Sequence, residues 1–112
     1  MTSTNPLKLL AIDDDVDNLE IIRLALEHHR LEILTSNDPE EGFQTFLRTR
    51  PKIVLLDLVM SKVSGIEILE RIVSVDPGVD VVLITAHYSD FAAVFWSSYF
   101  RSTRRDLSAV NL

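Results

Sequence analysis

The chain has 112 residues, of which 46% are hydrophobic and 25% charged, a composition typical of one globular domain. A net charge of −6 at pH 7 argues against binding nucleic acid or an anionic membrane through charge alone. The absence of cysteine excludes disulfides and thiol catalysis, and no apolar run approaches the roughly 20 residues that span a bilayer. These features predict a soluble cytoplasmic protein with no direct contact to nucleic acid or membrane.

Strands and helices are expected to alternate along the first three quarters of the chain. Short apolar runs predict strands at residues 7–12, 31–36 and 79–84, and a buried central strand in the stretch 52–60 that emerges at Asp57. Helical spacing predicts helices from Val16, from Pro39 after an Asp38 cap, and after Ser64, which forms a capping box with Glu67. Strands and helices that alternate through short loops indicate an α/β fold with a doubly wound parallel sheet.

Oxygen-bearing side chains follow three of the predicted strands. Asp13, Asp14 and Asp15 follow the first strand, Asp57 ends the third, and Thr85 follows the fourth. The carboxyl ends of parallel strands meet at one edge of a sheet, where ligands collect. A helix cap accounts for one or two of the three consecutive acids, but not for all of them.

The chemistry of this edge favours a cation and a phosphoryl group. Neighbouring carboxylates repel one another unless a cation neutralises them, and an all-oxygen site suits Mg²⁺ or Mn²⁺. A carboxylate such as that of Asp57 can attack phosphorus to form an aspartyl phosphate. The hydroxyl of Thr85 would then donate a hydrogen bond to a phosphoryl oxygen.

Three stretches resemble the receiver domain of bacterial two-component response regulators, the CheY-like family. They are Leu9–Asp15, Ile53–Met60 with Ser64-Gly65 eight positions beyond Asp57, and Val82–His87. The resemblance covers residues 7 to about 93 and implies a flavodoxin-like sheet with strand order 2-1-3-4. The run Thr85–Ser89 looks most similar to receivers of NtrC-type, sigma-54-dependent regulators.

The resemblance also implies roles for individual residues. Asp57 would be the phosphoacceptor and Thr85 the switch hydroxyl, while Asp13, Asp14, Asp57 and the main-chain carbonyl of Val59 would bind Mg²⁺, with Mn²⁺ as an alternative. The implied partner is a sensor histidine kinase or phosphotransfer protein in a phosphorelay. Such a domain promotes only its own phosphorylation and dephosphorylation, so it is not expected to be an enzyme.

The C-terminal part departs from the receiver pattern. Receivers carry a fifth strand ending in Lys-Pro and a final helix, but this chain has no lysine after Lys62 and no proline after Pro77. Ser61 also stands where receivers usually have proline. We therefore divide the chain into a receiver-like part, residues 1–93, and an atypical or truncated segment of the same domain, residues 94–112, with the fifth strand and last helix missing or replaced.

Aromatic residues around this boundary fit a helix with a wide apolar face, although a strand remains an alternative. An unpaired sheet edge and uncovered apolar side chains are association sites, so a homodimer held through the C-terminal segment is expected. A degenerate receiver that acts only as an interaction or dimerisation module is the first alternative function. The second is a haloacid-dehalogenase-like phosphatase with Asp13 as nucleophile, which leaves Asp57 unexplained.

Overall fold

Four parallel strands form a single sheet in the order β2-β1-β3-β4. The computed structural model describes residues 6–60 and 63–84. The strands are β1 (Leu7–Ile12), β2 (Leu31–Ser36), β3 (Ile53–Asp57) and β4 (Asp80–Ile84). The helices are α1 (Val16–Leu26), α2 (Pro39–Thr49) and α3 (Gly65–Val75). This arrangement confirms the predicted fold class and strand order.

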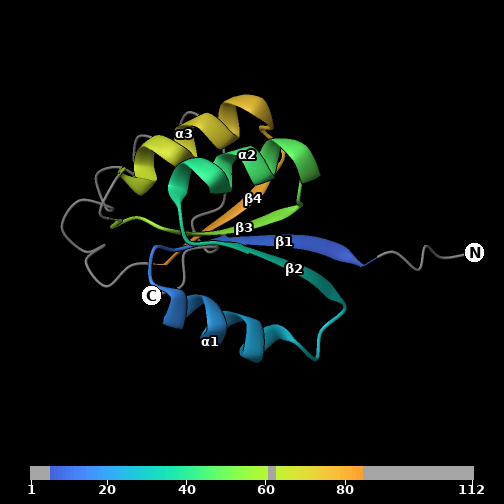
Figure 1. The fold of residues 1–112 in the computed structure, drawn as a ribbon. Helices are drawn as coiled ribbons and strands as arrows, with labels where there is room; N and C mark the ends of the chain where they lie inside the picture. The colour runs from blue at the N-terminus through green and yellow to red at the C-terminus, as the bar shows by residue number, and fades with distance from the viewer. Residues whose placement is uncertain (1–5, 61–62, 85–112) are drawn as a thin grey trace, which may run out of the picture.

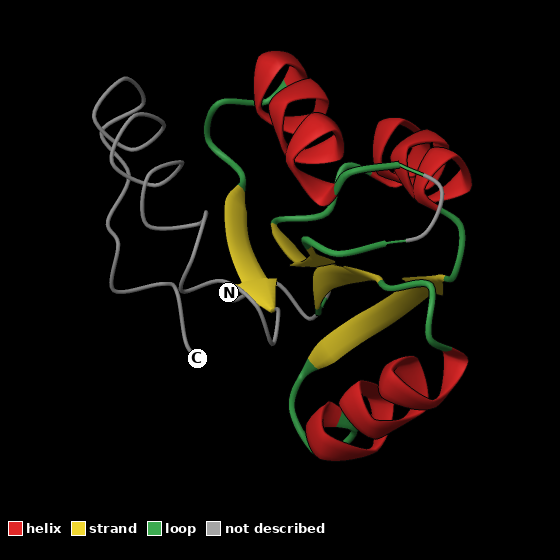
Figure 2. Ribbon diagram, turned by 90° about the vertical axis from the view of Figure 1, so that its left-hand side faces the viewer, coloured by secondary structure: helices red, strands yellow, loops and turns green. Residues whose placement is uncertain are grey.

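The helices cover the two faces of the sheet unequally. Figure 1 shows α1 below the sheet and α2 and α3 above it, and the turned view in Figure 2 shows the same division. Helix α1 packs mainly on β1 and β2, whereas α2 and α3 contact each other and together reach β1, β2 and β3. Of the described helices, one therefore packs on one face of the sheet and two pack on the other.

The alternation of side chains along β1 divides the core into two clusters. Leu10 and Ile12 lie in the larger cluster with Phe46 of α2 and Ile72 of α3, and all four are at most 1% exposed. Leu9 and Ala11 point to the opposite face, where they pack with Leu19 of α1. Because β1 lies between two neighbouring strands and two helical layers, the loop that follows it is held firmly in place.

The predicted helix starts are confirmed, with one difference in the hydrogen bonds. The Asp38 carboxylate accepts the Glu41 N–H at 2.9 Å, as an N-cap should, but the Glu41 side chain accepts from the buried Ser36 hydroxyl. Likewise, Ser64 caps α3 through the N–H of Ile66 rather than that of Glu67. Both helices thus have the expected cap residue without the reciprocal Glu bond of a capping box.

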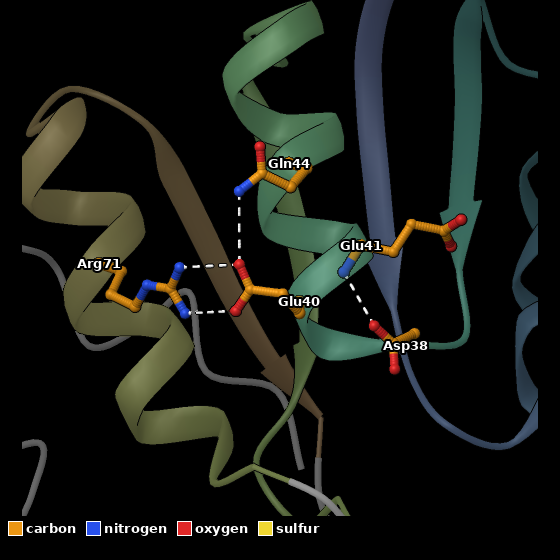
Figure 3. Close-up of polar contacts among 5 residues, drawn as sticks. All are labelled: Asp38, Glu40, Glu41, Gln44 and Arg71. Atoms are coloured by element: carbon orange, nitrogen blue, oxygen red, sulfur yellow. Dashed lines mark hydrogen bonds and ion pairs between the residues drawn. The ribbon is translucent and has the colours of Figure 1, made fainter.

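An exposed ion pair joins the two helices of the upper face (Figure 3). Arg71 of α3 donates two hydrogen bonds, of 2.9 and 3.1 Å, to the two carboxylate oxygens of Glu40 in the first turn of α2. Its guanidinium lies 4.1 Å from the centroid of the Phe43 ring, and Gln44 donates a further bond to Glu40. The hydrogen bonds from Arg71 and Gln44 lower the pKa of Glu40. The pair ties α3 to α2.

Several expectations concern residues outside the described ranges: Thr85, Ser61 and the whole segment 94–112. These expectations stay predictions. Among the described helices, none combines the length and the apolar character needed to cross a membrane.

Candidate functional site

The acidic residues predicted from the sequence meet at the carboxyl edge of the sheet. Asp57 is the last residue of β3, and Asp13 and Asp14 follow β1, which is the neighbouring strand. One carboxylate oxygen from each of the three residues lies within 4.8 Å of the others. Asp13 is buried, and Asp14 and Asp57 are half-buried.

The Asp57 carboxylate is held by its own turn. The main-chain N–H of Val59 donates to Oδ1 of Asp57 at 3.1 Å, whereas Oδ2 accepts no main-chain hydrogen bond from the described residues. Val59 itself is 46% exposed, and the role of its carbonyl as a metal ligand stays a prediction.

The environment of Asp57 raises its pKa from 3.8 to about 6. Burial is the largest cause, because it disfavours the charged carboxylate, and the negative charges of Asp13 and Asp14 act in the same direction. The hydrogen bond from Val59 opposes them. The site therefore concentrates negative charge beyond what its own hydrogen bonds offset.

In the described part of the chain, the Asp13 carboxylate accepts two hydrogen bonds and the Asp13 backbone N–H donates one. Oδ1 accepts the N–H of Asp15 at 2.9 Å, and Oδ2 accepts from the side-chain amide of Asn18 at 3.3 Å. The backbone N–H of Asp13 donates to the carbonyl of Ser36, at the end of β2. Asp15 serves instead as the N-cap of α1, where it accepts the N–H of Asp17. The three consecutive acids thus divide into one cap and two site residues.

The third strand end expected at the site carries Thr85, which lies outside the described ranges. The preceding residue, Ile84, is the register partner of Asp57 in the parallel ladder of β3 and β4. The chain therefore leaves β4 directly beside Asp57. The role of Thr85 as a switch hydroxyl stays a prediction.

Gly65, at the start of α3, allows the helix to approach the backbone of the Asp57 turn. A Cβ atom at this position would lie 2.5 Å from the Cα of Leu58, and closer still to the carbonyl oxygen of Asp57. The N–H of Gly65 donates to the carbonyl of Leu58 at 3.0 Å. A side chain at this point would push α3 or Asp57 out of place.

Sequence reasoning missed Asn18 and Ser36 as neighbours of the acidic pair. Asn18 is the third residue of α1, and helical side chains lean toward the N-terminus of their helix, so its reach back to Asp13 follows from the helix start. The contact of Ser36 with Asp13 was harder to predict from the sequence, because it depends on the register between β1 and β2.

The three carboxylates suit a hard divalent cation. Three oxygens within 4.8 Å, with one residue buried and two half-buried, match the few protein ligands and several waters that Mg²⁺ prefers. Burial and the charges of Asp13 and Asp14 raise the pKa of Asp57, and a bound cation would oppose this shift by favouring the ionised carboxylate. The fold and the site together define a parallel α/β domain with a cluster of carboxylates around a strand-end aspartate.

Comparison with known proteins agrees with this class. The family model of the response regulator receiver domain matches residues 9–97. The chain therefore belongs to the response regulator receiver domain family, whose members are receiver domains of two-component systems. The resemblance of the sequence motifs is confirmed.

Among curated relatives, the transcriptional regulatory protein GlrR of Escherichia coli is 32% identical over 87 residues, which cover 78% of this chain and 20% of GlrR. The chain spans between a fifth and little more than a third of the curated relatives it matches.

Solved structures show the same fold. A response regulator receiver domain protein from Clostridium thermocellum is 30% identical with a TM-score of 0.74, covering 83% of this chain and 75% of that one. The response regulator TrrA from Thermotoga maritima, solved in complex with Mg²⁺-BeF, is 27% identical with a TM-score of 0.69, covering 94% of this chain and 82% of that one.

Proposed function

We propose that this domain accepts a phosphoryl group on Asp57 from a sensor histidine kinase or a phosphotransfer protein in a two-component phosphorelay. The observation that carries the proposal is the position of Asp57 at the end of β3, with carboxylate oxygens of Asp13 and Asp14 within 4.8 Å of its own. Family membership supports the kind of donor.

The carboxylates of Asp13, Asp14 and Asp57, with the main-chain carbonyl of Val59, would hold Mg²⁺, and Mn²⁺ is the alternative ion. When bound, the cation offsets the charge of the carboxylates and of the incoming phosphoryl oxygens. TrrA, a relative by fold, was solved with Mg²⁺-BeF, which supports the choice of Mg²⁺.

The residues of the chain orient the nucleophile. The Val59 N–H fixes Oδ1 of Asp57, and Oδ2 attacks phosphorus. The bond between phosphorus and the donor's imidazole nitrogen breaks as the acyl phosphate forms, and the hydroxyl of Thr85 donates to a phosphoryl oxygen. The domain turns over no separate substrate, so we class it as a signalling domain of the cytoplasm rather than an enzyme.

Treatment with acetyl phosphate and Mg²⁺ tests this proposal directly. We expect intact-mass spectrometry to show the addition of one phosphoryl group that is stable to acid and lost in base, as an acyl phosphate is. Chelation of the metal with EDTA should abolish the addition, because the uncompensated carboxylates repel the anionic donor. A modified species that survives base would point to a phosphorylated hydroxyl and contradict the proposal.

The phosphatase alternative fits the geometry poorly. It needs Asp13 as the attacking group, but Asp13 is only 4% exposed and both of its carboxylate oxygens already accept hydrogen bonds. Asp57 is more accessible, and within the described part of the chain a main-chain N–H donates to only one of its two oxygens.

A specific observation favours the second function, that of a dimerisation module. On the face that α1 occupies, Ile21 and Leu24 of that helix are 62% and 54% exposed, and Ile84 of β4 is 38% exposed. A parallel sheet normally has both faces covered. We propose a homodimer in which the segment 94–112 of one copy covers this face of the other.

Light scattering over a concentration series checks the dimer. We expect a mass near twice 12.7 kDa, the mass of the chain, at high concentration. Ile21→Glu should shift the midpoint of association to at least about tenfold higher concentration, because it places a charge in the apolar contact. The control is Ser74→Glu, which makes the same change of charge at an exposed position of α3. A mass of one chain at every concentration would contradict the dimer.

A further inference from the structure

The inference concerns the amide of Asn18, which contacts the most buried carboxylate of the site. Asp13 is 4% exposed, whereas Asp14 and Asp57 are half-buried. A carboxylate taken out of water needs hydrogen-bond donors to remain charged. Within residues 6–60 and 63–84, two N–H groups donate to the Asp13 carboxylate, and one of them is the side-chain amide of Asn18, at 3.3 Å from Oδ2.

Apart from the neighbouring Asp57 side chain, the other described restraints on Asp13 come from the backbone. The N–H of Asp15 donates to Oδ1, and the N–H of Asp13 donates to the carbonyl of Ser36. These two bonds follow from the turn between β1 and α1 and from the pairing of β1 with β2, so a side-chain substitution leaves them in place. Of these three hydrogen bonds, the one from Asn18 is the bond that a side-chain substitution can remove.

An amide has suitable chemistry for this position. It donates a hydrogen bond without adding charge, so it holds an anionic oxygen without competing with a cation, as a lysine or arginine would. An aspartate at the same place would add a fourth negative charge to the three already there. Only the N–H side of the amide can meet a carboxylate oxygen, which fixes the orientation of Asn18.

We propose that Asn18 is a positioning residue that orients the Asp13 carboxylate toward Asp14 and Asp57 and so sets the affinity of the site for Mg²⁺. The inference rests on the proposed function, because it presumes that the acidic site takes a divalent cation. Hydrogen bonds to metal-binding side chains generally influence affinity, and their loss costs about 10- to 100-fold. Because the Asn18 contact is long and half-exposed, we expect the lower end of that range.

The test measures Mg²⁺ affinity by calorimetry at constant ionic strength, in the complete chain and four variants. Asn18→Ala removes the donor and should weaken Mg²⁺ binding about tenfold. Asn18→Gln keeps the amide on a longer side chain and should recover part of the loss. Asn37→Ala removes an exposed asparagine from the loop after β2 and should bind Mg²⁺ as the parent does. Asp14→Ala, which removes a proposed ligand, should show the largest loss.

A second readout separates positioning from a general effect on the fold. In phosphorylation by acetyl phosphate, Asn18→Ala should need about tenfold more Mg²⁺ for half-maximal rate but should reach nearly the parental rate when Mg²⁺ is saturating. Its denaturant midpoint without metal should match that of the parent.

The outcomes distinguish the two proposals. If Asn18→Ala binds Mg²⁺ within twofold of the parent, or if Asn18→Gln is no better than Asn18→Ala, the role of the amide is refuted while phosphorylation of Asp57 stands. A loss of the same size in Asn37→Ala would also refute it. A parent chain that binds no Mg²⁺, or that gains no phosphoryl group on Asp57, overturns the proposed function and this inference with it.

Discussion

Asp57→Asn should abolish covalent phosphorylation by acetyl phosphate or by a histidine kinase. The carboxamide nitrogen and oxygen are poor nucleophiles and cannot form the acyl phosphate, so we expect no detectable phosphoryl addition, a loss of at least about 100-fold. The fold should persist, because the substitution keeps the shape of the side chain and the acceptor oxygen for the Val59 N–H. Intact-mass spectrometry in parallel with the parent makes the comparison.

Asp13→Asn is the matched control, since it removes one charge from the same cluster. It should still be phosphorylated on Asp57, at a lower rate and with weaker Mg²⁺ binding. If Asp57→Asn kept the phosphoryl group and Asp13→Asn lost it, Asp13 would be the nucleophile and the phosphatase alternative would be correct.

The same substitution should stabilise the metal-free fold at neutral pH. The folded-state pKa of Asp57 is raised to about 6, so the folded protein holds this proton more tightly than the unfolded chain. The stabilisation from the protonated form is complete below pH 4 and is lost as pH rises through about 6. Above that pH, Asp57→Asn should raise the free energy of unfolding by about 1 kcal/mol, after allowance for solvent screening at this half-buried site.

Urea unfolding at pH 5 and pH 8, without metal, measures this gain. We expect it to be larger at pH 8, and to shrink when Mg²⁺ is added to the parent, because the cation favours the ionised carboxylate. A gain that grows toward acid pH would contradict the assignment of the raised pKa to Asp57.

Most of the fold and the core of the site followed from the sequence, because their causes are local. The apolar runs predicted both ends of β1 and of β2 correctly. The end of β3 at Asp57 follows from the cost of burying an unpaired carboxylate. Strand order came from the family resemblance, and the parallel arrangement then brought Asp13, Asp14 and Asp57 to one edge.

The missed features depend on contacts between elements. The Ser64 hydroxyl accepts the N–H of Ile66 rather than that of Glu67, and the Glu41 carboxylate accepts from the Ser36 hydroxyl. Both hydrogen bonds reflect the positions of neighbouring strands and helices rather than the cap motif itself. The Asn18 contact lies between these cases, since it needs only the start of α1 and the orientation of helical side chains. The expectations for Thr85 and for residues 94–112 concern parts of the chain outside the described ranges.

Gly65 shows how a residue without functional groups can control the phosphoacceptor. Its sequence position, eight residues after Asp57, was part of the family resemblance, but the reason for it is spatial. The first turn of α3 passes so close to Asp57 and Leu58 that only a hydrogen atom fits between the backbones. The ion pair of Glu40 with Arg71 helps to hold α3 at α2, so α3 is not free to retreat without breaking that contact.

Gly65→Ala should therefore destabilise the fold and slow phosphorylation together. The added Cβ would overlap backbone atoms rather than a flexible side chain, so we expect the free energy of unfolding to fall by about 3 kcal/mol, the upper end for overpacking. A displacement of Asp57 by about 1 Å should reduce the rate of phosphorylation by up to about 100-fold.

Gly78→Ala is the matched control, because its new Cβ would meet only the Asp76 Oδ1 atom, at an ordinary 3.5 Å. Urea unfolding and the time course of phosphorylation by acetyl phosphate, measured on both variants, test the prediction. We expect Gly78→Ala to stay within about 0.5 kcal/mol of the parent, as surface substitutions usually do. If Gly65→Ala did the same and kept the parental rate, α3 would be able to shift without moving Asp57, and the close approach would not govern the site.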